Sequence, residues 1–114
     1  PIFAIREMRA KSDGFELLFT EPVNVAGAAN PNSYRIQSYT YHYSSAYGSD
    51  EILPKQHDIK SVIVSPDGFS VRLKVEGMRP LCVHELWVDG LSSQDGILID
   101  HPRAYYTLNR IPSG

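Results

Sequence analysis

Residues of metal-ligand type gather around one polar segment in the middle of the chain. They are two histidines and three carboxylates, namely His42, Asp50, Glu51, His57 and Asp58. Carboxylate oxygens hold calcium, and two histidines with a carboxylate hold zinc. The spacing matches no compact metal motif, because the two histidines are not at the short separations typical of zinc ligands. We therefore interpret the segment as a solvated polar loop without a metal, and keep metal binding as the alternative.

Nucleophilic catalysis has no motif in this sequence. No serine lies in a Gly-x-Ser-x-Gly elbow, and the chain has neither a glycine-rich phosphate loop nor a dinucleotide fingerprint. A triad of Ser44, His42 and Asp50 can be assembled from composition alone, but a triad is recognised by its geometry. The sequence therefore predicts a protein that is not an enzyme, has no catalytic residues and needs no cofactor.

Tyrosines supply the third candidate for chemistry. Five of the seven tyrosines fall between residues 32 and 51. Because side chains alternate between the two faces of a strand, Tyr34 and Ile36 are expected to face the core. The opposite face then carries Arg35 and Gln37 together with three tyrosines, which are Tyr39, Tyr41 and Tyr43. Trp87 is out of phase with its apolar neighbours and is also expected to point outward, with Tyr47 nearby.

These aromatic residues predict a ligand- or partner-binding surface made of Tyr39, Tyr41, Tyr43, Tyr47 and Trp87. Exposed aromatic patches mark contact sites, and tyrosine combines stacking area with a hydroxyl group that suits both sugars and proteins. Contact with a neighbouring domain of a longer polypeptide is favoured over binding of a free carbohydrate. The alternative is that loops of the same domain cover the row.

Length, composition and charge limit the class of protein. A chain of 114 residues with 42% hydrophobic and 21% charged residues predicts a single globular domain over residues 1–114. A formal net charge of −2 offers no broad basic surface for nucleic acid. No apolar run approaches the ~20 residues of a membrane span, so no membrane insertion is expected. The only cysteine, Cys82, is expected to be a small buried hydrophobe.

Strand-like alternation between turn signals predicts about seven strands and almost no helix. They cover residues 3–10, 15–20, 32–43, 59–65, 69–75, 81–88 and 104–109. A bulge is expected near Arg6, a short helical turn between residues 24 and 31 is an alternative to a loop, and residues 44–56 are expected to be a loop. This pattern is typical of an antiparallel β-sandwich.

The predicted core follows from the same alternation. Its members are Phe15, Leu17, Phe19, Ile36, Val71, Leu73, Leu86, Val88 and Leu108. Phe69 and His84 are also expected to point inward, because each is in phase with the apolar residues of its own strand.

Residues 13–24 read DGFELLFTEPVN and residues 30–36 read NPNSYRI. These two segments resemble bacterial immunoglobulin-like domains of the S-layer type. That family commonly ends its second strand with a Phe-Thr/Ser-x-Pro-Val run and opens its third with an Asn-Tyr pair. Its later pattern is present here as Leu81, His84, Leu86, Val88, Gly90, Leu91, Asp95 and Gly96. The resemblance implies an immunoglobulin-like or fibronectin-III-like sandwich.

A narrower resemblance involves the tyrosine-rich strand, the YGSDE segment and the run AYYTLNRIP at residues 104–112. These are similar to a module of large secreted bacterial proteins, where it accompanies sugar-dehydrogenase-like propellers and c-type cytochrome domains. The resemblance implies an extracytoplasmic setting, whether periplasmic, secreted or cell-surface. It also implies an accessory role beside a catalytic or electron-transfer domain. Since the chain starts at Pro1, we expect it to be a piece of a longer polypeptide.

One position departs from the family pattern. His84 stands where such sandwiches often have a tyrosine whose hydroxyl bonds back to an upstream backbone group. A histidine can make the same bond through a ring nitrogen, so we expect His84 to be a satisfied, partly buried histidine.

Overall fold

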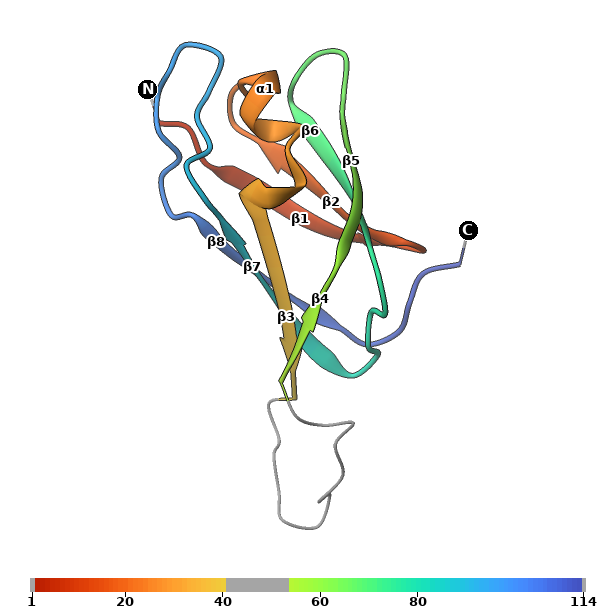
Figure 1. The fold of residues 1–114 in the computed structure, drawn as a ribbon. Coiled ribbons are helices and arrows are strands. Elements are labelled where there is room, and N and C mark those ends of the chain that lie inside the picture. The colour runs from red at the N-terminus through yellow and green to blue at the C-terminus, as the bar shows by residue number, and fades with distance from the viewer. Residues whose placement is uncertain (1, 41–53, 114) are drawn as a thin grey trace.

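The computed structural model describes residues 2–40 and 54–113, and almost all of its regular structure is strand (Figure 1). Its eight strands are β1 (Ile5–Lys11), β2 (Gly14–Phe19), β3 (Tyr34–Tyr39), β4 (Lys55–His57), β5 (Ile59–Val64), β6 (Ser70–Val75), β7 (Cys82–Val88) and β8 (Arg103–Leu108). A single turn of helix, α1 (Val25–Ala28), and a 3₁₀ turn, η1 (Pro31–Ser33), precede β3. The predicted antiparallel all-β sandwich is confirmed, with one strand beyond the predicted seven.

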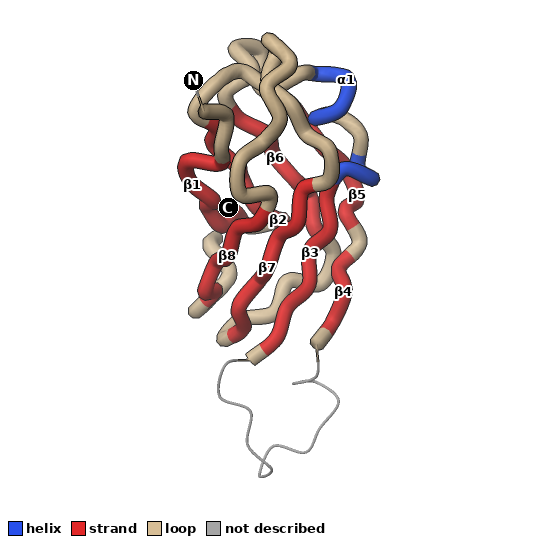
Figure 2. Tube along the Cα trace, turned by 90° about the vertical axis from the view of Figure 1, so that its left-hand side faces the viewer, coloured by secondary structure: helices blue, strands red, loops and turns tan. Residues whose placement is uncertain are grey.

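The strands form two four-stranded antiparallel sheets that pack face to face. The first sheet has the order β1-β2-β6-β5, and the second has the order β4-β3-β7-β8 (Figure 2). The two apolar inner faces form one core, as in other aligned sandwiches. No helix in the described ranges is long and apolar enough to cross a membrane.

Strand β4 overlaps the end of the predicted loop at residues 44–56 and extends one residue beyond it, to His57. It has only three residues and pairs with β3 through Ile36–His57, Gln37–Gln56 and Ser38–Lys55. Such a short run cannot show alternation by itself. After Asp58 the chain continues directly into β5, which belongs to the other sheet. One extended segment therefore changes sheets, and the register irregularity between Ile59 and Ser61 marks the bend.

The β1–β2 hairpin confirms the bulge expected near Arg6, because the register shifts between Ile5 and Glu7. Gly14 opens β2 beside the carbonyl of Leu73, and a side chain at this position would collide with that carbonyl. Glycine is therefore needed here for the packing of β2 against β6, directly after the turn at residues 12–13. Asn24 caps α1, accepting a hydrogen bond from the Gly27 amide, so the alternative of a short helical turn holds here.

All nine predicted core residues are buried, and Cys82 is buried as expected. The prediction for Phe69 is wrong, because its side chain is 41% exposed. Strand β6 begins only at Ser70, and Phe69 lies beside the turn at Gly68, at the end of the sheet where the core no longer covers it. Phe3 and Phe19 stack on each other with ring centroids 5.5 Å apart and are fully or almost fully buried.

Tyr34 fastens the turn between α1 and β3 to the core. Its buried hydroxyl donates a hydrogen bond of 2.7 Å to the carbonyl of Ala28, and burial raises the pKa of Tyr34. We expect Tyr34→Phe to lower the free energy of unfolding by about 1 kcal/mol, because the Ala28 carbonyl loses its donor. Urea unfolding measures this loss. The matched control is Tyr105→Phe, whose exposed hydroxyl should contribute less than ~0.5 kcal/mol. Equal losses in the two variants would contradict the role given to Tyr34.

Candidate functional site

The outer face of the second sheet carries a row of alternating aromatic and basic side chains. Trp87 on the central strand β7 pairs with Arg35 on β3 and with Arg103 on β8. Both guanidinium carbons lie 5.2 Å from the centroid of the indole ring. Strands β3 and β8 flank β7 on opposite sides (Figure 2). The two arginines therefore reach Trp87 from its two neighbouring strands. Such cation–π contacts contribute about 0.5–1 kcal/mol each at exposed sites.

A buried carboxylate holds one of these arginines in place. Glu85 lies on β7 two residues before Trp87, on the same outer face, and its side chain is 8% exposed. Its carboxylate forms an ion pair with Arg103, with 3.1 Å between Oε2 of Glu85 and Nη2 of Arg103. Arg103 is therefore neutralised and fixed, whereas Arg35 is exposed and has no acidic partner in the described part of the chain. The row presents one unmatched positive charge beside an aromatic ring.

The next row of the same face is uncharged apart from Glu85. Gln37 and Tyr105 flank Glu85 on either side. The side-chain amide nitrogen of Gln56 on β4 donates a hydrogen bond of 2.8 Å to the side-chain oxygen of Gln37. Tyr105 is 55% exposed. Tyr39 lies one row further, opposite Val83, and is half-buried.

The structure places two predicted site residues on this outer face and brings other residues to them. Tyr39 shares the face of Arg35 and Gln37, and Trp87 points outward, both as the alternation predicts. The two aromatic residues lie about 13 Å apart along the strands, since four residues separate their rows. The remaining predicted residues, Tyr41, Tyr43 and Tyr47, lie outside the described residues. Arg103 and Tyr105, which were not among the predicted site residues, complete the face. The alternation of residues 104–109 is the sequence signal that could have found Tyr105.

The inner side of the second sheet holds a polar network at the end of the core. Ser38 on β3 is fully buried and bonds to His57 on β4 at 2.7 Å. The other ring nitrogen, Nδ1 of His57, lies 2.8 Å from the carbonyl of Glu76, so it must carry the proton. Nε2 of His57 therefore accepts from the Ser38 hydroxyl. Arg79 completes the chain of bonds by donating from Nε to the Ser38 hydroxyl and from Nη2 to the Ser38 carbonyl, each at 2.8 Å.

His84 on β7 extends this network into the core. Its Nε2 accepts a hydrogen bond of 3.2 Å from the backbone amide of Arg79, five residues upstream, and its Nδ1 lies 3.3 Å from the carbonyl of Cys82. The expected bond from a ring nitrogen back to the upstream backbone is thus confirmed, although His84 is fully and not partly buried. The ring stacks on His57 at 5.3 Å and contacts Phe15 at the same centroid distance.

Both histidines are neutral at pH 7. Burial lowers the pKa of His84 to about 4, with a further contribution from His57. Burial also lowers the pKa of His57, against the opposing effect of its bond to the Glu76 carbonyl. Each Nε2 is a hydrogen-bond acceptor in this network, so a proton there would turn an attractive contact into a repulsive one.

The burial and the hydrogen bonds of Ser38 and His57 indicate a structural role for this polar network. The distance between Ser38 and His57 would suit a nucleophile and its base, but Ser38 has no exposed surface and its hydroxyl already accepts from Arg79. His57 is oriented by a backbone carbonyl and not by a carboxylate. Both of its nitrogens are occupied, so His57 does not fit the alternative of a metal ligand. His42, Asp50 and Glu51 lie outside the described residues. Residues 2–40 and 54–113 contain no group of three or more His, Cys, Asp or Glu side chains that could hold a metal ion.

Comparison with known proteins finds similarity at the level of structure. No family model matches the chain, and no curated protein matches it. Among solved structures, the crystal structure of the S-layer protein rSbsC(31-844) superposes with a TM-score of 0.73 at 20% sequence identity. The matched region is 99% of this chain and 14% of the rSbsC(31-844) chain. The N-terminal part of the S-layer protein SbsC gives 0.72 at 20% identity, with coverage of 96% and 24%. The surface layer protein SbsC, domains 1-6, gives 0.73 at 19% identity, with coverage of 99% and 14%. The chain spans less than a quarter of each of these chains, and at this identity the likeness shows a shared fold.

Proposed function

We propose that this chain is a non-catalytic structural and interaction module of a larger extracytoplasmic bacterial protein. The observation that carries the proposal is the pair of coverages: nearly all of this chain matches a small part of S-layer chains. A fold that occurs as one unit among others in a surface protein fits a role as a spacer or packing partner. Residues 1–114 would then be one immunoglobulin-like domain, as the sequence resemblance implies.

The outer face of the second sheet is the surface we assign to this role. Tryptophan, tyrosine and arginine dominate the binding energy of protein interfaces, and Trp87, Tyr105 and Arg35 lie together on the outer side of this sheet. The polar network on the inner side is satisfied within the domain. Binding therefore falls to the outer face, where a neighbouring catalytic or electron-transfer domain of the parent polypeptide would pack.

Carbohydrate binding is the second candidate, and the exposed Tyr105 beside Trp87 is the observation in its favour. A sugar that stacks on tryptophan needs an open ring face. Here guanidinium groups from two neighbouring strands lie over the indole. A protein partner can use this arrangement without displacing the arginines, because it can engage the edge of the ring and the free charge of Arg35. The geometry therefore favours a protein partner.

Two titrations separate the candidates. The chain is titrated calorimetrically with the adjoining domain of its parent polypeptide, and run in affinity gels that contain polysaccharides. We expect the adjoining domain to bind and the polysaccharides to leave mobility unchanged. Trp87→Ala should weaken domain binding by more than ~1 kcal/mol, as truncation of an aromatic anchor does. The control Ile63→Ala changes an exposed residue of the other sheet and should not alter binding. Retardation by a polysaccharide together with no domain binding would reverse the assignment.

A further inference from the structure

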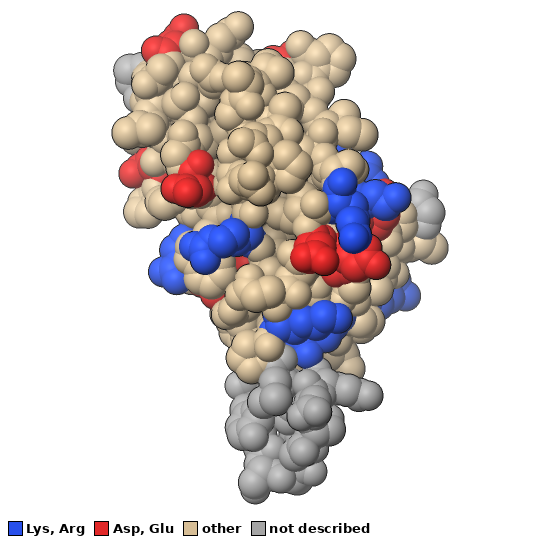
Figure 3. Space-filling view, in the orientation of Figure 1, with Lys and Arg blue, Asp and Glu red and all other residues tan. Residues whose placement is uncertain are grey.

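The charges of this protein are separated between its two ends. The loop pole, which we define as residues 2–4, 20–33, 65–69 and 89–102, is the end opposite the β6–β7 turn. Its carboxylates are Glu21, Asp67, Asp89, Asp95 and Asp100, and it contains no lysine or arginine. All 11 Lys and Arg residues and 8 of the 13 acids lie elsewhere, so the formal charge is −5 at the pole and +3 in the rest. Figure 3 shows this on one face, where basic side chains are absent from the upper end.

The loop pole also exposes large apolar side chains. Ile2 and Leu98 are 67% and 70% exposed, and Val25 and Phe69 are exposed as well. Isolated exposed apolar residues are ordinary, but four on one end with a purely acidic surround form the pattern of an interface centre and its rim.

Backbone hydrogen bonds hold the segments of the loop pole together. The bonds run from Val23 to Gly68 at 2.9 Å, Asn24 to Ser92 at 2.9 Å, Gln94 to Pro22 at 2.8 Å and Asp100 to Phe3 at 2.7 Å. Each joins segments that are distant in the sequence. A surface fixed in this way loses little conformational entropy when a partner binds.

The opposite end of the sandwich has the complementary character. The basic end, which we define as residues 11–14, 74–81 and 107–113, contains Lys11, Lys74, Arg79 and Arg110 against Asp13 and Glu76. Leu81 in this end is 74% exposed and has a φ of 66°, a backbone conformation that bulky residues rarely adopt. Residues held in such conformations cluster at functional sites, which makes Leu81 a candidate contact residue.

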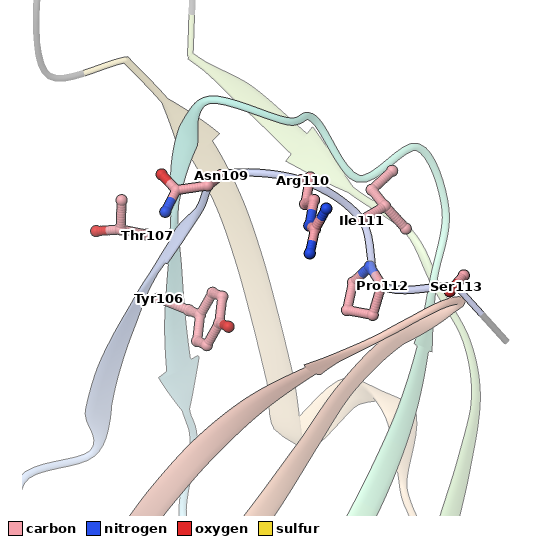
Figure 4. Close-up of a pocket in the computed structure, with 7 residues that line it drawn as sticks. All are labelled: Tyr106, Thr107, Asn109, Arg110, Ile111, Pro112 and Ser113. Carbon is pink, nitrogen blue, oxygen red and sulfur yellow. The ribbon is translucent and has the colours of Figure 1, made fainter.

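A hollow in the basic end combines polar side chains with three larger apolar ones, Tyr106, Ile111 and Pro112. It has a volume of about 590 Å³ and is lined by Tyr106, Thr107, Asn109, Arg110, Ile111, Pro112 and Ser113. Figure 4 shows the Tyr106 ring and the Arg110 guanidinium on the same side of the C-terminal segment, both facing the hollow. Arg110 forms no ion pair with any described carboxylate, so its charge is available to an incoming acid.

We propose that the loop pole of one copy docks onto the basic end of a second copy, head to tail. Leu98 would enter the hollow, and the pole carboxylates would face Arg110 and Lys74. The contact joins two different surfaces, so it is heterologous and can repeat into an open row of copies. The inference rests on the proposed role as an interaction module, but it uses the two ends and leaves the outer face of the second sheet free.

Sedimentation velocity of the unmodified chain is the first test. At about 0.01 M salt, where charges act over roughly 30 Å, we expect the average sedimentation coefficient to rise with protein concentration. At about 1 M salt, where the range is roughly 3 Å, the chain should return to a monomer. A monomer at all concentrations in low salt, or association that is insensitive to salt, would overturn the proposal.

Charge reversal at each end tests which surfaces meet. The pole variant carries Asp89→Lys, Asp95→Lys and Asp100→Lys, which changes the formal charge of the pole from −5 to +1. The end variant carries Lys74→Glu and Arg110→Glu, which changes the basic end from +2 to −2. Each alone should lose at least tenfold in self-association, because each then has two ends of like charge. An equimolar mixture should associate again, because every contact between the two variants is complementary. Circular dichroism confirms that both variants fold. Failure of the mixture to associate would exclude a head-to-tail contact.

The control Arg35→Glu reverses a charge on the outer face of the second sheet. It should leave self-association unchanged and weaken binding of the adjoining parent domain. The two proposals can therefore fail independently: loss of domain binding by Arg35→Glu tests the proposed function, and rescue in the mixture tests the head-to-tail contact. Loss of self-association in Arg35→Glu would contradict the assignment to the two ends.

Discussion

Lowering the pH from 7 to 4 is expected to reduce the free energy of unfolding by about 3 kcal/mol through His84 alone. The unfolded chain takes up a proton on this histidine near pH 6.5, whereas the folded protein resists protonation until about pH 4. The stabilisation is therefore complete above pH 6.5 and is lost as the pH falls toward 4. His57, whose pKa is also lowered, adds to the loss in the same direction.

The physical reason is the set of groups that face His84. The Nε2 atom of His84 accepts a hydrogen bond from the Arg79 amide. The His84 ring also stacks on His57 and contacts the ring of Phe15. A proton on Nε2 would oppose one donor to another and place a charge in a dry core beside the Arg79 side chain. Urea unfolding at pH 7, 6, 5 and 4 measures the effect. His101→Gln is the control, because the His101 side chain is 88% exposed and lies outside the buried network, so the loss of stability should persist in this variant. A stability that stays constant between pH 7 and 4 would show that His84 is not held neutral by the fold.

Leu73→Ala is expected to reduce the free energy of unfolding by about 2–5 kcal/mol, because it removes a fully buried side chain from the centre of the first sheet. Leu73 pairs with Phe15 on β2 and with Val62 on β5, so the surrounding strands cannot collapse into the space. The matched control is Ile63→Ala on the neighbouring strand, where a 64% exposed side chain should contribute less than ~0.5 kcal/mol. A loss below ~1 kcal/mol for Leu73→Ala in urea unfolding would show that the wrong face of β6 was taken as the core.

Alternation predicted the core because β2, β3 and β6 each bury one face and leave the other at least partly exposed. Strand β6 shows the strength of this signal: Val71, Leu73 and Val75 are all buried as expected. It also shows the limit, because the same phase placed Phe69 inside, and a sequence pattern does not tell where the opposing sheet stops covering a strand. Strand β4 was missed for a different reason, since three residues carry no readable period and its pairing with β3 is a tertiary property.

The candidate site was predictable one strand at a time. The outward orientation of Trp87 followed from the phase of its own strand. The arginines beside it did not, because the contact requires the registers of β3, β7 and β8 together. The stacking of His57 on His84 was hidden for the same reason. The bond of His84 back to the upstream backbone was expected from the resemblance to sandwiches that carry a tyrosine at this position.

Hydroxyl-radical footprinting of the isolated chain and of its parent polypeptide tests most directly whether the outer face of the second sheet is an interface. The method reports the solvent exposure of individual side chains, and Trp87 and Tyr105 are both reactive. We expect both to be modified several-fold more slowly in the parent, because the adjoining domain covers them. Ile63, on the other sheet, should react equally in the two samples and serves as the internal reference. Equal modification of Trp87 and Tyr105 in the isolated chain and in the parent would contradict the account.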